Sequence, residues 1–281
     1  MSALPDPSPP GASASSPLRD WLDRHQRLFV LTGAGCSTGS GIPDYRDRNG
    51  DWKRTPPMTL QALTGSDAAY RRYWARSSIG WPRFHAARPN GSHAALAELE
   101  RRGRVRLLLT QNVDGLHQRA GSRAVVDLHG RLDAVVCLGC GARSPREEVQ
   151  LHIVDANPGW QAGVARTAPD GDADLGDEAV AGFRPPWCPH CRGLLKPDVV
   201  FFGEAVPRQR VDEAQRALHE TDAMLVAGSS LMVWSGFRFA RMAAAAGLPI
   251  AILNAGRTRA DALATLRIDA DIATTLQEAL R

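Results

Sequence analysis

Four of the five cysteines stand in two Cys-x-x-Cys pairs, Cys137 with Cys140 and Cys188 with Cys191. Such a pair forms a tight turn that directs two thiolates toward one ion, and two pairs are typical of a tetrahedral zinc site. Four thiolates leave no open position for water, so we expect a structural metal rather than a catalytic one. Buried free thiols or a redox pair are the alternatives. The N-terminal residues lack the basic start and apolar centre of a secretory signal, which favours metal over disulfides.

A second stretch that could do chemistry is LFVLTGAGCSTGSGIPDYR, from Leu28 to Arg46. It begins as an apolar run and continues into a glycine-rich turn, as a buried strand does when it passes into a ligand-binding loop. Gly33 and Gly35 lack Cβ atoms, so the backbone there could lie close to a diphosphate. The spacing is GxGxxxG rather than the GxGxxG of a dinucleotide fingerprint. The stretch alone therefore leaves a structural turn as open as a nucleotide site.

The elements that must position these residues follow from four short apolar runs, at 28–31, 105–109, 223–227 and 249–253. Apart from Arg106 the runs are apolar throughout, as expected of parallel strands covered on both faces, and each is followed by small or polar residues. The sequence therefore predicts the α/β class: a Rossmann-like, doubly wound parallel sheet with a smaller inserted zinc-binding module.

In such a sheet the ligand crevice lies beyond the carboxyl ends of the strands. The loops that follow the four runs should therefore meet there. They lie at 33–46, 110–114, 228–230 and 254–256. Four converging loops favour a mononucleotide or dinucleotide site over a structural turn.

One helix is well marked between the first two runs. Ser92 is expected to cap it, and the helix extends through Glu100 until Gly103 ends it. Farther along, Val125-Val126 predicts a short strand that places His129 just beyond its end.

At 281 residues the chain has room for one large domain with a smaller insert. The proline-rich start predicts a disordered tail, and the turn-forming and acidic composition of 141–187 predicts a long loop. We therefore divide the chain into a tail at 1–17, a Rossmann-like domain at 18–130 and 201–281 with a helical insert at about 45–90, and a zinc-binding domain at 131–200.

Composition argues against two classes of function. The formal net charge of +4 includes 34 basic residues, yet no aromatic interleaving or nucleic-acid motif accompanies the basic clusters, so we expect no nucleic-acid partner. No stretch approaches the roughly 20 consecutive apolar residues of a membrane helix, so we expect no membrane partner. We expect instead a monomeric, cytoplasmic protein of bacterial origin.

Several motifs, taken in order along the chain, resemble the sirtuin family of NAD-dependent protein deacylases. They are GAGCSTGSGIPDYR at 33–46, TQNVDGLH at 110–117, His129-Gly130, the four cysteines, KPDVVFFGE at 196–204, GSS at 228–230 and LNAG at 253–256. Within the family, the segments at 73–76, 80–82, 157–160 and 168–171 resemble class II, the branch that includes the mitochondrial lipoamidase-type sirtuin.

The resemblance implies NAD as co-substrate, one structural zinc ion and an acylated-lysine protein or peptide as partner. In this family the acyl oxygen attacks C1′ of the nicotinamide ribose, nicotinamide leaves, and the acyl group passes to ADP-ribose. His129 would be the base that takes a proton from the ribose hydroxyls, and Asn112 would position the ribose beside it. An extended substrate peptide would pair with the strand formed by Val199, Val200, Phe201, Phe202 and Gly203.

The residues that the resemblance assigns to NAD lie in the four converging loops and at one later position. They are Gly33, Ala34, Gly35, Ser37, Ile42, Asp44, Arg46, Gln111, Asn112, Asp114, Gly228, Ser229, Ser230, Asn254, Ala255, Gly256 and Ile272.

Two other functions stay open, namely mono-ADP-ribosyl transfer to a protein and a non-catalytic NAD-sensing scaffold. Acyl preference is a further hypothesis: Tyr73 and Arg76 have the spacing by which another sirtuin branch holds acidic acyl groups, and a guanidinium suits a carboxylate. Cys36, in the glycine-rich loop, suggests a redox or nucleophilic role only weakly, because no base is assured beside it.

Overall fold

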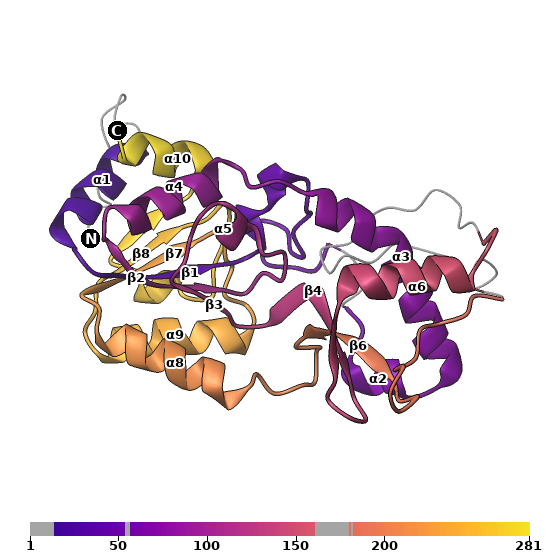
Figure 1. The fold of residues 1–281 in the computed structure, drawn as a ribbon. Coiled ribbons are helices and arrows are strands. Elements are labelled where there is room, and N and C mark those ends of the chain that lie inside the picture. The colour runs from indigo at the N-terminus through magenta and orange to yellow at the C-terminus, as the bar shows by residue number, and fades with distance from the viewer. Residues whose placement is uncertain (1–13, 54–56, 161–179, 181) are drawn as a thin grey trace.

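The computed structural model describes residues 14–53, 57–160, 180 and 182–281. Figure 1 shows an elongated molecule in which a sheet between helices occupies one end and a smaller sheet with its own helices occupies the other.

The larger sheet, within the described residues, has six parallel strands in the order β3-β2-β1-β7-β8-β9. Their bounds are β1 Leu28–Thr32, β2 Val105–Thr110, β3 Val125–Asp127, β7 Ala223–Ala227, β8 Ile250–Leu253 and β9 Leu266–Ile268. The chain adds β2 on one side of β1 and later β7 on the other side, so the strand order reverses at β1. The predicted doubly wound parallel sheet is confirmed.

Helices cover both faces of this sheet (Figure 1). One face carries α1 Ser15–Arg24, α4 Gly91–Arg101 and α10 Ile272–Ala279, and the other carries α8 Arg208–His219 and α9 Trp234–Ala245. Every residue of β1, β7 and β8 is buried, which explains why these runs are apolar rather than alternating. The short segments in the loops are η1 Ala34–Cys36, η2 Thr38–Ser40, α5 Leu116–Arg119 and η3 Asp261–Leu263.

The N-terminal cap of α4 differs from the prediction, because Asn90 and not Ser92 occupies that position. Asn90 Oδ1 accepts from the Ser92 N–H at 2.8 Å, and His93 Nδ1 accepts from the Asn90 N–H at 3.2 Å. Asparagine and serine cap helices about equally well, and Asn90 also donates to the carbonyl of Cys36 at 2.8 Å. This contact ties the helix start to the loop after β1. The predicted helix end holds, since Gly103 has the left-handed φ of +74°.

The tail expected at 1–17 ends earlier than expected. Residues 1–13 lie outside the described residues, but α1 begins at Ser15. Pro17 falls in its first turn, where the missing N–H of proline removes no helical hydrogen bond. Leu18 and Trp21 of this helix are buried in the core of the sheet.

The smaller sheet is antiparallel, in the order β5-β4-β6. Its strands are β4 Gly130–Cys137, β5 Arg143–Pro145 and β6 Leu195–Val199, and α2 Leu60–Thr64, α3 Asp67–Ala86 and α6 Arg146–Ala156 pack around it. Its core contains Tyr70, Trp74 and Phe183 together with Cys137 and Cys188. The expected helical insert and the cysteine region therefore share one core, while the domain boundaries stay a prediction.

The prediction of a long loop over 141–187 is wrong for its first part, where β5 and α6 form. Val149 and Ile153 of α6 are buried, but Leu151 and Val154 on the same helix are 60% and 58% exposed. Apolar residues on both sides of α6 obscure its helical period in the sequence. Residues 161–179 lie outside the described residues.

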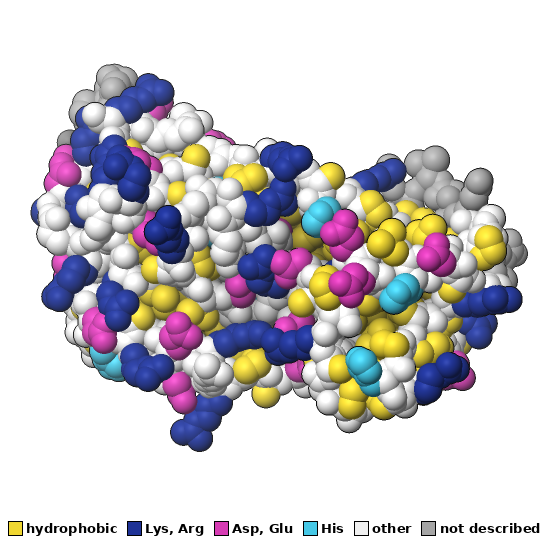
Figure 2. All heavy atoms as spheres, viewed as in Figure 1, with side chains coloured by type: hydrophobic (Ala, Val, Ile, Leu, Met, Phe, Trp, Pro, Cys, Tyr) yellow, Lys and Arg dark blue, Asp and Glu magenta, His cyan; other side chains and the backbone are white. Residues whose placement is uncertain are grey.

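The surface carries the mixture of basic and acidic side chains that the sequence composition implies. Figure 2 shows acidic side chains interspersed among the basic ones on one face, and hydrophobic side chains gathered toward the end that holds the smaller sheet. Among the described helices, none is long and apolar enough to cross a membrane.

Candidate active site

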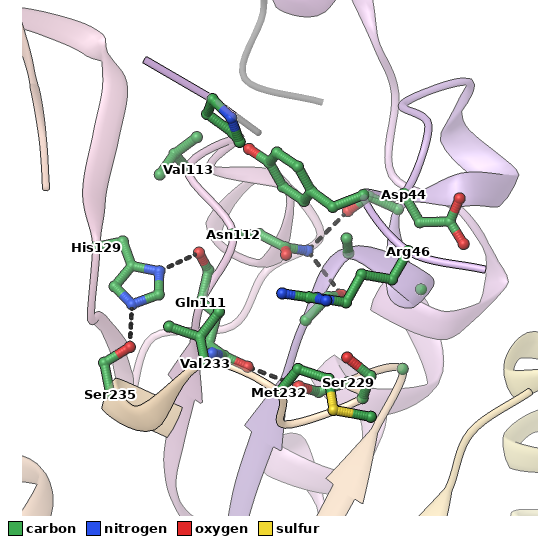
Figure 3. Close-up of a pocket in the computed structure, with 18 of the residues that line it drawn as sticks. Asp44, Arg46, Gln111, Asn112, Val113, His129, Ser229, Met232, Val233 and Ser235 are labelled. Carbon is green, nitrogen blue, oxygen red and sulfur yellow. Dashed lines mark hydrogen bonds between the residues drawn. The ribbon is translucent and has the colours of Figure 1, made fainter. Parts of the chain in front are cut away.

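A cavity of about 670 Å³ lies where β1, β2 and β7 end. All four loops that were expected to meet contribute to its wall, together with residues 199–206 between β6 and α8. Every residue predicted to bind NAD or the substrate peptide lines the cavity, with the exception of Gly256. His129 lines it as well, and Figure 3 shows the central side chains.

The glycines after β1 allow two loops to pack against each other. A Cβ at Gly33 would lie 2.8 Å from the Ser229 Cβ, and a Cβ at Gly35 would lie 2.9 Å from the Gly228 carbonyl oxygen. Gly228 has φ +65°, and a Cβ there would lie 2.5 Å from the backbone nitrogen of Cys36. The β1 and β7 loops thus meet backbone to backbone, which requires residues without a Cβ. A close approach of a diphosphate to the same turn stays a prediction.

The loop after β8 is shaped by its own side chains. Asn254 Nδ2 donates to the carbonyls of Ala255 and Gly256, both at 3.1 Å. Gly256 has φ +87°, and a Cβ there would lie 2.5 Å from the Arg48 carbonyl oxygen. Gly256 therefore packs the loop after β8 against the backbone of Arg48. The prediction that it lines the NAD cavity is wrong.

His129 follows β3, and its ring is held at both nitrogens (Figure 3). The Gln111 carbonyl, 2.9 Å from Nδ1, can only accept, so Nδ1 carries the proton. Nε2 is then unprotonated and accepts from the Ser235 hydroxyl at 2.7 Å. Burial lowers the pKa of His129 to about 4, opposed by the Gln111 hydrogen bond and assisted by the charges of Arg210 and Arg238. The imidazole is therefore neutral at pH 7, as a general base must be.

Ser37 joins the loop after β1 to the loop after β2. Its buried hydroxyl donates to Asp114 Oδ2 at 2.7 Å and accepts from Asn112 Nδ2 at 3.0 Å. His93 Nε2 lies 3.4 Å away and donates, because its Nδ1 accepts from the Asn90 backbone. A serine hydroxyl has one donor and two acceptor positions, and all three are used here. The side chains of Asn112 and Asp114 are thereby fixed at the cavity wall.

Two further hydrogen bonds connect the loops. Asn112 Nδ2 also donates to the Gly33 carbonyl at 3.0 Å, and Ser229 Oγ donates to Gln111 Oε1 at 2.6 Å. The loops after β1, β2 and β7 are therefore bonded to one another through side chains that were expected to bind NAD.

At the cavity mouth, Asp44 and Arg46 are both engaged with the segment that follows them. Lys53 Nζ donates to Asp44 Oδ1 at 2.5 Å. The Arg46 guanidinium lies 3.9 Å above the Trp52 ring and donates to the Gly50 carbonyl at 2.7 Å. Both side chains therefore stand in a folded-back loop at the rim.

The prediction that Val199–Gly203 forms a strand is wrong beyond its first residue, because β6 ends at Val199. The residues that follow are held instead by the ion pair between Lys196 and Glu204. Lys196, with 9% of its side chain exposed, lies 3.0 Å from Glu204 Oε2 and donates to the Val199 carbonyl at 2.5 Å. The same Glu204 oxygen accepts from the Phe201 N–H at 2.7 Å. These contacts hold one wall of the cavity in place.

The Sγ atoms of the four paired cysteines all lie within 4.8 Å of one another. Cys137 and Cys191 are 3.4 Å apart, and Cys140 and Cys188 are 3.7 Å apart. Sulfurs about 2.3 Å from a central zinc ion would be separated by about 3.8 Å. The four thiols therefore fit a tetrahedral metal site, and their separations exceed the roughly 2.0 Å of a disulfide.

Comparison with known proteins identifies the family. The sequence profile of the Sir2 family matches residues 33–235, a range that includes the loop after β1, His129 and all four metal-type cysteines. The chain belongs to the Sir2 family. An NAD-dependent protein deacetylase of Xanthomonas axonopodis pv. citri (strain 306) is 62% identical over 259 residues, which are 92% of this chain and 88% of that protein.

Solved Sir2 structures share the fold. One holds a Sir2 protein with a p53 peptide and NAD⁺, is 28% identical and has a TM-score of 0.75, with 94% of this chain and 96% of that chain covered. Another, Sir2Tm bound to a propionylated peptide, is 29% identical and also has a TM-score of 0.75, with the same coverage.

Sequence reasoning missed one wall of this Sir2 cavity. Met232, Val233, Ser235 and Arg238 line it from the end of the β7 loop and the start of α9. The signal was their place directly after the GSS loop, because residues that follow a crevice loop and begin the next helix face the same crevice.

An apolar wall was also missed, formed by residues such as Met58, Phe84 and Leu132. Tyr73 belongs to this wall, but among the described residues that line the cavity Arg76 is absent. Of the two residues proposed to hold acidic acyl groups, the structure therefore places Tyr73 in the cavity wall but not Arg76.

Cys36 is unsuited to nucleophilic chemistry. Its thiol is buried and donates to the Ala227 carbonyl at 3.3 Å. Burial, with a smaller contribution from Asp114, raises the pKa of Cys36 to about 12. The thiol is therefore protonated at neutral pH and acts as a small packing residue.

Proposed function

We propose that the chain removes acyl groups, in particular acetyl, from protein lysines with NAD as co-substrate. The observation that carries this proposal is His129, a neutral imidazole tethered at Nδ1 in the wall of a cavity built by Sir2 loops. The deacetylase of Xanthomonas, 62% identical to this chain, supports the same activity. The products would be nicotinamide, O-acyl-ADP-ribose and free lysine.

The groups at the polar side of the cavity suit NAD. The Ser229 hydroxyl and the Asn112 amide oxygen match sugar hydroxyls, while Ser37 would act by holding Asn112 and Asp114 in place. The Arg46 guanidinium matches a diphosphate that would lie beside the glycine turn after β1. Asp114, fixed by Ser37, would face the nicotinamide carboxamide. When bound, NAD would supply a glycosidic bond whose cleavage releases nicotinamide, and a ribose that accepts the acyl group.

The residues of the chain position groups and move a proton. His129 would accept the proton of a ribose hydroxyl, since its neutral form predominates above about pH 4. Asn112, held by Gly33 and Ser37, would fix the ribose against it. Apolar residues such as Ile42 would exclude water from the reacting atoms. No protein nucleophile is required.

The acylated lysine would enter along Val199–Gly203, with its peptide backbone beside that segment. The apolar wall around Met58, Tyr73 and Phe84 suits an uncharged acyl chain. Preference for acidic acyl groups and membership of class II stay hypotheses, and so does the assignment of each NAD contact.

One zinc ion would be held by the four cysteines, whose sulfur separations fit tetrahedral thiolate coordination. With every coordination position taken by sulfur, its role would be structural. It would join the β4 and β6 sides of the small sheet and so support the strand that leads to the substrate segment.

Protein mono-ADP-ribosyl transfer and an NAD-sensing scaffold are the alternatives. Both would use the same cavity, and a scaffold would have no use for a tethered neutral base. A monomeric state and a cytoplasmic location stay predictions.

The test is incubation of the purified chain with NAD and an acetyl-lysine peptide, followed by mass spectrometry. We expect the peptide to lose its acetyl mass as nicotinamide is released. His129→Ala should lower the rate by about 10²- to 10⁴-fold, the usual contribution of a general base. His152→Ala, at an exposed histidine on α6, is the matched control and should leave the rate unchanged.

Two results would reject the proposal. Gain of an ADP-ribosyl mass on an acceptor protein with no acetyl loss would favour the transferase. No nicotinamide release with any acyl-lysine peptide would favour the scaffold.

A further inference from the structure

The hydroxyl of Ser235 occupies the ring nitrogen through which the base would act. It donates to His129 Nε2 at 2.7 Å, and both side chains line the same cavity. Figure 3 shows the serine at the start of α9 with its hydroxyl directed at the ring. Because the Gln111 carbonyl is bonded to Nδ1, both nitrogens of the imidazole are engaged. A substrate proton can reach Nε2 only through this hydroxyl or after the hydroxyl turns away.

The start of α9 is shaped to place Ser235 there. A Cβ at the next residue, Gly236, would lie 2.5 Å from the Gln111 Nε2 atom. A glycine at this position therefore lets the helix pack closely against Gln111, whose carbonyl is bonded to His129. One turn later, Arg238 donates to the Ser235 carbonyl at 3.1 Å and lines the cavity as well. The first turn of α9 thus packs closely on the Gln111 side chain, and a bond from Arg238 within the helix holds that turn together.

Among the described residues, the other groups that bond to the ring or act on its charge cannot pass a proton to it. The Gln111 carbonyl only accepts, and the guanidinium groups of Arg210 and Arg238 keep their protons in proteins. A hydroxyl both donates and accepts, so it can stay bonded to Nε2 before and after the ring is protonated.

We propose that Ser235 relays a proton from the ribose hydroxyl of the co-substrate to His129, an inference that rests on the deacylase function proposed above. The Ser235 O–H bond breaks as the Nε2–H bond forms. At the same time Ser235 Oγ takes the proton of the ribose hydroxyl, whose oxygen keeps the electron pair for its bond to the acyl carbon. The serine ends neutral with one proton, and the imidazole ends as imidazolium.

The first test uses the free enzyme and needs no NAD. Nitrogen-15 spectra of histidine-labelled protein should show His129 in the Nδ1–H tautomer, with Nε2 accepting a hydrogen bond. In Ser235→Ala the Nε2 resonance should move downfield, as expected of a nitrogen that loses its donor, and in Ser235→Thr it should stay near its original position. An Nε2 resonance that is the same in Ser235→Ala and in the unmodified protein would overturn the relay.

The second test separates the two chemical stages. Attack by the acyl oxygen and departure of nicotinamide move no proton through the base, whereas the later stage does. Ser235→Ala should therefore keep exchange of labelled nicotinamide into NAD within about twofold and lower formation of deacylated peptide by about 10- to 100-fold, part of the usual general-base contribution. Ser235→Thr should restore most of the rate.

Solvent isotope effects complete the test. A relay moves two protons in one step, so the rate of the unmodified enzyme should depend on the deuterium fraction along a curve, and that of Ser235→Ala along a straight line. Two outcomes would contradict the relay. Full deacylation by Ser235→Ala would show that the hydroxyl turns away and that the ribose proton reaches His129 directly, and equal loss of exchange and deacylation would show a structural role.

Absence of deacylation by the unmodified enzyme would reject the proposed function, while the nitrogen-15 result would still report on the hydrogen bond.

Discussion

The two ends of the molecule are stabilised in different ways. In the six-stranded sheet the central strands are buried completely, and helices on both faces enclose two large apolar clusters. Within the described residues the smaller sheet has three strands, one of them only Arg143–Pro145, and its core relies on aromatic residues beside two of the metal-type cysteines. Burial of apolar surface suffices for the first end, whereas the second is expected to need its metal.

The base stands between these two ends and is held by both. Its ring is tethered to Gln111, which follows β2 of the large sheet, and its carbonyl accepts from the Val200 N–H at 2.8 Å, just after β6 of the small sheet. Disturbing either end should therefore reach His129, but by different routes and with different magnitudes.

Removal of the metal should have the largest effect. Cys188→Ser, or a strong chelator, should abolish zinc binding and nearly all deacylation, because β4 and β6 lose the cluster that joins them. Most of the helical circular dichroism should remain, since α1, α4 and α8 to α10 belong to the large sheet. Zinc analysis and spectroscopy measure both effects.

Cys36→Ser is the matched control, because Cys36 lies in the core of the large sheet and away from the four-cysteine cluster. It should keep about one zinc per chain. Full activity of a preparation without zinc would contradict the expectation that the small-sheet end needs a metal and the large-sheet end does not.

Shortening a core side chain next to the large sheet should affect the protein less than removal of the metal, and the metal should stay bound. Phe239 of α9 is buried and stacks on Phe29 of β1, with ring centroids 5.8 Å apart. Phe239→Ala should lower the free energy of unfolding by about 3–5 kcal/mol through lost transfer energy and a cavity. Chemical denaturation measures this change, and zinc content should stay unchanged. Loss of zinc in this variant would mean that the two ends unfold as one unit.

Acid should lower the free energy of unfolding by a smaller amount, spread over several pH units. Burial lowers the pKa of His117 to about 3 and that of His129 to about 4, both below the 6.5 of an unfolded histidine. The unfolded state thus binds more protons below pH 6.5, so stability is fully present above that pH and is lost as the pH falls toward 4. Each histidine should contribute a slope of about 1.4 kcal/mol per pH unit.

Denaturation at several pH values, with zinc content followed in parallel, measures this slope. His117→Asn should reduce it, and His152→Ala, at an exposed histidine, should leave it as it is. A stability that does not change between pH 6.5 and 5 would contradict neutral burial of these rings.

Much of this protein was determined by its sequence alone. The apolar runs predicted the parallel sheet because strands buried on both faces admit no polar alternation. The cysteine pairs predicted the metal-type cluster because two residues on one tight turn fix their own geometry. The loops that follow the strands predicted where the cavity lies, and the motifs taken together along the chain predicted the family.

Other features depended on contacts between residues far apart in the chain. Propensity does not distinguish Asn90 from Ser92 as a cap, but the bond to Cys36 does. The three residues of β9 are too few to form a pattern, and α6 is apolar on two sides. Such elements form because tertiary packing outweighs weak local preference.

The relay residue is the clearest example of what only the tertiary structure decided. Ser235 is 106 positions from His129, and no spacing in the sequence relates the two. Their hydrogen bond exists because parallel strands bring the segments after β3 and β7 to one edge, and because Gly236 lets the start of α9 pack against the Gln111 side chain. The sequence supplied the chemical groups, and the folded chain set the distance and direction between them, on which proton transfer depends.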